Sequence, residues 1–189
     1  MARRILAIMR HGGTHLVKPI LKQTIGSSKG GKGDTILKFP TGGEVIVCTR
    51  DPRNRIVSSF RYKQFRVGRH PSASDDHDEL LSRYMAGTDI VQYMHKWADQ
   101  WMGLPNAHYI SFEDFLTEDS AVLAVSGAAE YTGIEVTEEA IRNLWLMFYR
   151  NSPTYTGKHS RWQDWFGTKS RAVWKSHNGK LLTKKMGYR

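Results

Sequence analysis

The chain has 189 residues, about the length of one domain, and 40% of them are hydrophobic. It can therefore bury a core, which excludes wholesale disorder. No apolar run approaches the roughly 20 residues needed to cross a bilayer, so we expect no membrane span. No charged-then-apolar signal segment opens the chain, and we expect a cytoplasmic protein. The one cysteine, Cys48, excludes an intrachain disulfide framework, and we expect its thiol to be buried and inert.

Charge is distributed unevenly around the net value of +10. Residues 1–66 carry 14 basic and 3 acidic side chains, residues 67–154 carry 5 and 14, and residues 155–189 carry 9 and 1. A fold that brings both basic ends around one anionic ligand fits this pattern better than a chain that coats a duplex, so we expect no nucleic acid partner. Solvated faces that merely differ in sign are the alternative interpretation.

Strands alternate with helices along the chain. The expected strands are Arg3–Met9, Thr35–Phe39, Glu44–Thr49 and His108–Phe112. The expected helices are His15–Ile25, a segment that starts at Pro52, Glu79–Met102 in two pieces around Gly87, Ser120–Tyr131, Thr137–Arg150 and the tail from about Lys169. This order predicts one α/β domain over residues 1–189, with a mainly parallel central sheet flanked by helices. Ligands of such sheets bind beyond the carboxyl ends of the strands.

The first strand ends in R-H-G-G-T-H, residues 10–15, directly before a helix. Gly12 and Gly13 allow the backbone to turn sharply and present its N–H groups, while the start of the helix adds partial positive charge. These features predict a cradle for phosphate or sulfate, and a glycine turn of purely geometric origin is the alternative. Further donors come from the side chains of Arg10, His11 and His15.

The strand Glu44–Thr49 runs into T-R-D-P-R-N-R-I-V-S-S-F. Asp51 can cap the following helix, and Pro52 suits its first helical position. Arg50 at the strand end and Ser58 two turns along the helix can converge on one anion, which arginine grips bidentately and serine binds through its hydroxyl. A solvated basic helix is the alternative. The face away from the apolar stripe of this helix is expected to carry Asn54, Arg55, Ser58 and Arg61.

Two other functions compete with binding of a small anion. Residues 26–33 fit G-x-x-x-x-G-K, but Gly33 stands where a nucleotide kinase or NTPase places its Mg²⁺-binding Ser or Thr. This segment also lacks the strand before it and the helix after it that such a loop requires. The second alternative, a basic nucleic-acid-binding module, is disfavoured by the acidic middle of the chain and by the lack of a recognised motif.

The motifs resemble those of the sulfotransferases that use 3′-phosphoadenosine-5′-phosphosulfate (PAPS). In that family the first strand ends in K-x-G-T-[T/R], and the third leads into R-[D/N]-P with a serine eight residues after the arginine. Residues 50–58 complete the second signature, and residues 11–15 are similar to the first, with histidine at the lysine position. Weaker similarities lie in Tyr109–Phe115, Gly157–Trp162 and Met186–Tyr188.

The resemblance implies a P-loop NTPase-like three-layer sandwich and transfer of a sulfuryl group from PAPS to a hydroxyl or amine, without a metal ion. The spent donor would be 3′,5′-adenosine bisphosphate (PAP). By this resemblance, Arg50 and Ser58 bind the 3′-phosphate. The 5′-phosphosulfate would be held by Gly12, Gly13, Thr14 and His15, and the loop that closes over the nucleotide would consist of Gly157, Lys158, Arg161 and Trp162.

Catalysis by this chemistry needs a cation at the departing 5′-phosphate and a base at the acceptor. His11 stands at the position of the family lysine, and Arg10 or Lys38 is the alternative cation. The base is, in order of preference, Asp34, His15 or Glu44. The chain is short for this family, which suggests an open site for a large acceptor such as a saccharide or a protein.

Overall fold

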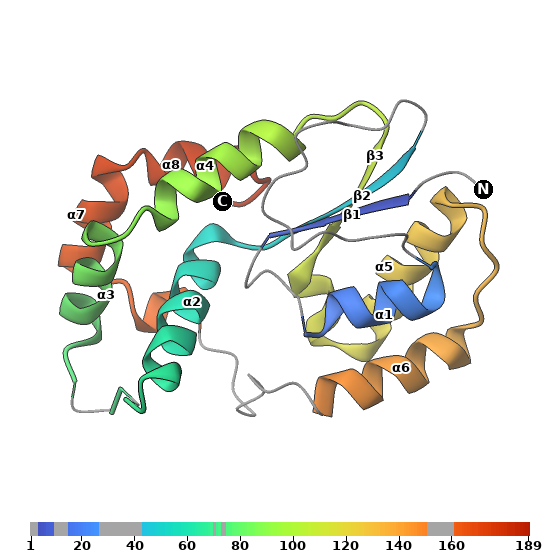
Figure 1. The fold of residues 1–189 in the computed structure, drawn as a ribbon, viewed down its shortest axis with the longest axis horizontal. Coiled ribbons are helices and arrows are strands. Elements are labelled where there is room, and N and C mark those ends of the chain that lie inside the picture. The colour runs from blue at the N-terminus through green and yellow to red at the C-terminus, as the bar shows by residue number, and fades with distance from the viewer. Residues whose placement is uncertain (1–3, 10–14, 27–42, 70, 73–74, 151–160) are drawn as a thin grey trace. The chain divides into compact units, whose positions relative to one another are not determined.

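The computed structural model describes residues 4–9, 15–26, 43–69, 71–72, 75–150 and 161–189 (Figure 1). The chain divides into two compact units. Unit 1 consists of Met1–Arg50 and Gly103–Tyr155, and unit 2 consists of Asp51–Met102 and Thr156–Arg189. The division therefore falls inside the Arg50–Ser58 signature. The single domain over residues 1–189 stays a prediction.

Unit 1 contains a parallel sheet of the strands β1 (Arg4–Ile8), β2 (Glu44–Thr49) and β3 (Ala107–Ser111), in that spatial order. Ile5 lies opposite Val45, and Val45 lies opposite Ala107. The predicted parallel α/β arrangement is thus confirmed, with strand bounds within one residue of those expected. The expected strand Thr35–Phe39 lies outside the described residues.

The helices of unit 1 are α1 (Val17–Thr24), the 3₁₀ helix η1 (Phe112–Leu116), α5 (Glu118–Tyr131) and α6 (Glu138–Arg150). Helix α1 follows Leu16 and has no side-chain cap, whereas α5 and α6 begin at threonine caps. Thr117 accepts a hydrogen bond from the N–H of Ser120 at the start of α5, and Thr137 accepts one from Ala140 at the start of α6. Both helices carry two acidic residues in their first turn, where the helix dipole favours negative charge.

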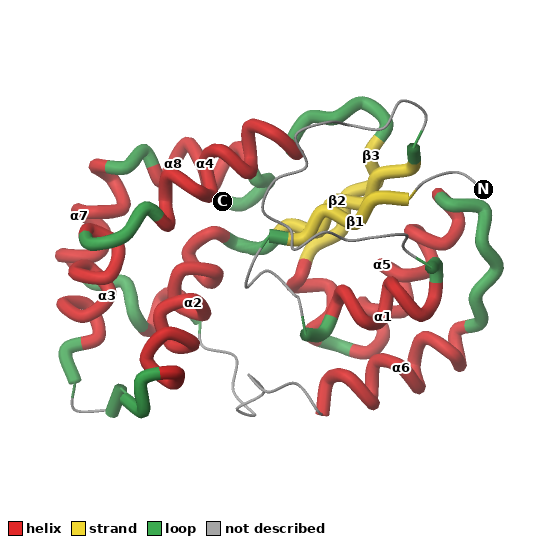
Figure 2. The backbone as a smooth tube through the Cα atoms, in the orientation of Figure 1, coloured by secondary structure: helices red, strands yellow, loops and turns green. Residues whose placement is uncertain are grey.

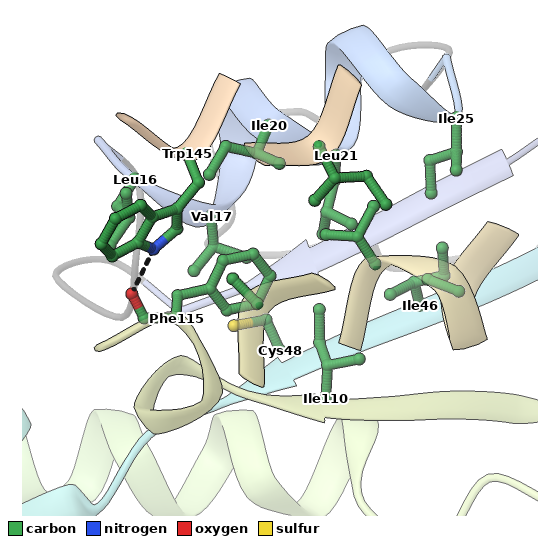
Figure 3. Close-up of a cluster of buried hydrophobic side chains, with 14 of the residues drawn as sticks. Leu16, Val17, Ile20, Leu21, Ile25, Ile46, Cys48, Ile110, Phe115 and Trp145 are labelled. Carbon is green, nitrogen blue, oxygen red and sulfur yellow. Dashed lines mark hydrogen bonds between the residues drawn. The ribbon is translucent and has the colours of Figure 1, made fainter. Parts of the chain in front are cut away.

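The core of unit 1 lies between one face of the sheet and α1, α5 and α6 (Figure 3). The Nε1–H of Trp145 donates a buried hydrogen bond of 2.9 Å to the carbonyl oxygen of Phe115. Cys48 is completely buried in this core, as predicted. Residues on the other face of β1 and β2, such as Ala7 and Val47, are also buried, which explains why these two strands are almost continuous apolar runs.

The described residues of unit 2 form helices joined by loops (Figure 2). Helix α3 packs against α7, and α4 packs against α8. The predicted break at Gly87 is confirmed, because this residue ends α3 and α4 starts three residues later. The elements are α2 (Pro52–Arg66), α3 (His77–Ala86), α4 (Ile90–Trp101), the 3₁₀ helix η2 (Trp162–Asp164), α7 (Thr168–Ser176) and α8 (Gly179–Lys185).

Helix α2 begins as predicted and differs from the prediction on its polar face. The Asp51 carboxylate accepts a hydrogen bond from the N–H of Arg53 at 2.9 Å, and Pro52 occupies the first turn. Arg55, however, is not on a solvated face: it is only 2% exposed, and its guanidinium lies 4.9 Å from the centre of the Tyr93 ring. The ring of Tyr93, from α4, thus lies against a residue whose charge alone predicted exposure.

Candidate functional site

The structure describes only part of the predicted site. His15, Glu44, Arg50, Ser58, Arg161 and Trp162 lie in described segments. The other predicted residues lie outside them: Arg10, His11, Gly12, Gly13, Thr14, Asp34, Lys38, Gly157 and Lys158.

In unit 1, Arg50 stands at the carboxyl edge of the sheet. Thr49 pairs with Ser111 as the strands end, so the residues that follow, Arg50 and Phe112, leave the sheet at the same edge. The Arg50 guanidinium carbon lies 4.1 Å from the centre of the Phe112 ring. This cation–π contact orients a half-buried arginine at the edge where ligands of parallel sheets bind.

Two carboxylates share this edge. The Ser111 hydroxyl donates to Glu113 Oε2 at 2.7 Å, and the Ser111 N–H donates to Asp114 Oδ2 at 2.9 Å. Burial is the main cause that raises the pKa of Cys48; the charge of Glu113 raises it further and that of Arg50 lowers it. The charges of Glu113 and Arg50 thus both influence the buried thiol of Cys48. Sequence reasoning cited Glu113 only within a family similarity, although its place just after a strand marked it as a residue of this edge.

The candidate bases in unit 1 occupy different places. Glu44 is the first residue of β2, whereas Arg50 follows the last. Six strand residues at about 3.3 Å each separate the two by roughly 20 Å. The structure therefore places Glu44 at the amino edge of the sheet, away from Arg50. His15 is exposed, two residues before α1.

In unit 2, the tail, which here means the segment from Arg161 to Arg189, lies against α2, the helix that carries Ser58. The backbone N–H of Trp162 donates a hydrogen bond of 2.9 Å to the Asn54 side-chain oxygen. Asn54 and Ser58 are four residues apart and share one face of α2. The structure thus brings the main chain of Trp162 to within about one helical turn of Ser58. Arg161 is exposed, with its guanidinium 3.8 Å from Asp164.

The Trp162 ring is covered by arginines. The Arg53 guanidinium carbon lies 4.1 Å from the ring centre, and that of Arg171 lies 5.5 Å from it. Arg53 also forms two hydrogen bonds with Asp51, of 2.9 and 2.7 Å. Sequence reasoning missed the contact of the tail with Arg53, because residues more than 100 positions apart carry no local signal of their pairing.

The described ranges contain neither a candidate metal site nor a candidate membrane span. No group of three or more His, Cys, Asp or Glu side chains there could hold a metal ion. None of the helices that the structure describes is long and apolar enough to span a membrane.

Comparison with known proteins relates these residues to one family. A family model described as "Sulfotransferase domain" matches residues 43–172. The structure is similar to that of mouse sulfotransferase SULT7A1 complexed with PAP, with 14% sequence identity and a TM-score of 0.61 over 97% of this chain and 88% of that chain. It is also similar to retinol dehydratase in complex with androsterone and inactive cofactor PAP, with 19% identity and a TM-score of 0.49 over 79% of this chain and 50% of that one. The comparison with curated proteins gives no match.

The likeness to the mouse protein confirms the expected fold class. The family match contains Arg50 and Ser58, which carry the complete signature, and Trp162 from one of the weaker similarities. The loop of residues 11–15 lies before the matched region.

Proposed function

Because this chain belongs to the sulfotransferase family, we propose that it is an enzyme that transfers a sulfuryl group from PAPS to a hydroxyl or amine acceptor and releases PAP. The matched region contains the Arg50–Ser58 signature in full. The solved structure that shares this fold is a complex with PAP, which supports the same nucleotide here.

One observation carries the assignment of the 3′-phosphate site. The hydrogen bond from Trp162 to Asn54 keeps the basic tail beside the face of α2 on which Ser58 lies. Arg50, held over Phe112 at the end of β2, supplies a planar guanidinium suited to bidentate contact with phosphate. The proposed 3′-phosphate ligands are therefore Arg50 and Ser58. Lys158 and Arg161 would belong to the loop that closes over the nucleotide.

Sulfuryl transfer breaks the bond between sulfur and the 5′-phosphate oxygen and forms a bond from sulfur to the acceptor oxygen or nitrogen. Negative charge builds on the departing phosphate, so cationic donors at that oxygen lower the barrier. We assign this role to His11 and to the backbone N–H groups of Gly12 and Gly13, with Arg10 or Lys38 as the alternative cation. Thr14 and His15 complete the contacts to the phosphosulfate, and no metal ion takes part.

A base must accept the proton that the acceptor hydroxyl or amine loses. The position of Glu44 at the amino edge of the sheet argues against this residue. Asp34 and then His15 remain the proposed bases. A saccharide or protein acceptor and a cytoplasmic location stay predictions from the sequence.

Thermal unfolding with different ligands tests the proposal. A ligand that binds only the folded state raises its stability by about 2.7 kcal/mol at a concentration 100 times its Kd. We expect PAP to raise the melting temperature, and adenosine 5′-monophosphate to raise it less because it lacks the 3′-phosphate. Stabilisation by ATP–Mg²⁺ or a DNA oligomer, without stabilisation by PAP, would overturn the assignment in favour of a kinase or a nucleic-acid-binding module.

A further inference from the structure

The Trp162 ring contacts two arginines and a phenylalanine of unit 2. The Arg53 guanidinium covers its ring at 4.1 Å, and Arg171 lies at 5.5 Å. The ring of Phe166 stands edge-on to it at 5.7 Å, with an angle of 86° between the planes. The ring is half-buried among these side chains, and the face that Arg53 covers at 4.1 Å is not available to stack on a nucleotide base.

The backbone of Trp162 is tied to the same helix as its ring. Its N–H donates to Asn54, and Arg53 precedes Asn54 in the first turn of α2. Ser58 lies four residues beyond Asn54, about 6 Å further along the helix axis. One helical turn thus holds Trp162 by its ring and its main chain, and the next turn carries a proposed phosphate ligand.

Arg53 is itself held in place. Its guanidinium donates to both carboxylate oxygens of Asp51, at 2.9 and 2.7 Å, and to the backbone oxygen of Arg189 at 2.7 Å. Asp51 is buried and caps α2 through the N–H of Arg53. The surface that receives Trp162 is therefore continuous with the cap of the helix and has little freedom to rearrange.

We propose that Arg53 and Asn54 form with Trp162 an anchor that fixes the tail beside Ser58 and so sets the affinity for the donor nucleotide. All three act as positioning residues: they hold the main chain at residue 161, where the loop proposed to close over the nucleotide joins the rest of unit 2. The inference rests on the proposed function and assigns Trp162 a role other than contact with the nucleotide.

Calorimetric titration of the full chain with PAP tests the anchor. Asn54→Ala removes the acceptor of the Trp162 N–H, and we expect it to raise the Kd for PAP about tenfold. Trp162→Ala should raise it further, whereas Trp162→Phe keeps a ring beneath Arg53 and should stay within about threefold of the unmodified chain. The double variant Asn54→Ala/Trp162→Ala should bind more weakly than either single variant, because one change removes the main-chain hydrogen bond of the anchor and the other removes its ring contact.

Steady-state kinetics separate positioning from catalysis. We expect Asn54→Ala to raise the KM for PAPS and to leave kcat within about twofold, since a saturating donor restores the bound geometry. Trp165→Phe is the matched control: its ring stacks on His77 at 4.2 Å and meets Phe60 edge-on at 5.8 Å, and neither contact belongs to the anchor, so this change should lower the melting temperature without changing the Kd for PAP.

The outcomes distinguish the two proposals. If the unmodified chain does not bind PAP, the proposed function fails and the anchor with it. If it binds PAP, and Asn54→Ala and Trp162→Ala bind equally well, the anchor is wrong and the function stands. An equal loss of affinity in Trp165→Phe also overturns the anchor, because general destabilisation would explain it. Should Trp162→Ala fail to fold, Asn54→Ala decides, since it removes one half-buried polar side chain.

Discussion

The guanidinium carbon of Arg50 lies 4.1 Å from the centre of the Phe112 ring, where β2 and β3 end side by side. The ring orients the planar guanidinium, whose forked donors match the geometry of a phosphate.

Replacing Arg50 therefore tests the donor site. Arg50→Ala should raise the Kd for PAP about 10- to 150-fold, since charge-assisted hydrogen bonds contribute about 1.5–3 kcal/mol. Arg50→Lys keeps the charge but loses the planar fork, so we expect an intermediate loss. Calorimetric titration gives both values, and exposed Arg69→Ala serves as the control. Unchanged binding by Arg50→Ala would remove this residue from the site.

Asp78 joins two helices of unit 2. Its carboxylate accepts hydrogen bonds from the N–H groups of Gly167 (3.0 Å), Lys169 (2.9 Å) and Ser170 (2.8 Å), and from the Ser170 hydroxyl. One α3 side chain thus caps the start of α7. We expect Asp78→Ala to lower the free energy of unfolding by about 2 kcal/mol, measured by urea denaturation.

Asp89 provides the matched control for this cap. It stands at the N-cap of α4 but makes no capping hydrogen bond through its side chain. Asp89→Ala should change the free energy of unfolding by less than about 0.5 kcal/mol. Equal losses in the two variants would contradict the role given to Asp78.

The three carboxylates at the start of α3, Asp76, Asp78 and Glu79, should make the free energy of unfolding fall at low pH. Burial raises the pKa of Asp78, but hydrogen bonds from Ser170, Lys169 and Gly167 outweigh it and bring the pKa below its ordinary 3.8. The N–H of Glu79 lowers the pKa of Asp76, and a hydrogen bond from Lys169 lowers that of Glu79 from its ordinary 4.5. The unfolded chain therefore binds more protons than the folded chain at low pH. The resulting stabilisation is complete above about pH 4.5 and is lost as the pH falls further.

Urea denaturation at a series of pH values measures this loss. The free energy of unfolding should decline below about pH 4.5, and the decline should be shallower in Asp78→Asn, which has no carboxyl group to protonate. If the free energy of unfolding declines equally steeply with pH in the unmodified chain and in Asp78→Asn, Asp78 does not contribute to the loss of stability in acid.

Cys48 should report global unfolding. It is completely buried, and burial, followed by the charge of Glu113, raises the pKa of its thiol well above the ordinary range. A chromogenic disulfide reagent should therefore label the native protein only as fast as it unfolds, and label it at once in concentrated guanidinium chloride. Complete labelling of the native protein within the mixing time would contradict this burial.

Gly179 opens α8 beneath an indole ring. A Cβ atom added there would overlap the buried ring of Trp174, which has no room to move aside without disturbing its packing. We expect Gly179→Ala to lower the free energy of unfolding by about 1–3 kcal/mol. Gly127→Ala in α5 is the control, because its Cβ would come no closer than 3.4 Å to His108 and alanine favours the helix. Chemical denaturation that ranks the two variants in the opposite order would refute this account.

Local structure was predictable wherever neighbouring residues decide it. The strand Glu44–Thr49, the cap at Asp51 and the break at Gly87 all follow from apolar runs, capping side chains and glycine, which act over a few residues. The motif around Arg50 and Ser58 likewise lies within nine consecutive residues, so the family could be identified from it. The position of Arg50 at the carboxyl edge of the sheet was predictable too, because the residue directly follows the strand Glu44–Thr49.

The contacts that shape the candidate site were not predictable in this way. Arg55 is buried and contacts the ring of Tyr93 from α4, Trp162 meets Asn54 across 108 positions, and Asp78 caps a helix that starts 90 residues later. Such pairings depend on how helices pack, which is decided by the sum of many weak contacts and leaves no periodic trace in any one segment. The amino-acid sequence by itself thus determined the elements, their order and the family signature. The tertiary structure alone decided which distant side chains hold that signature in place.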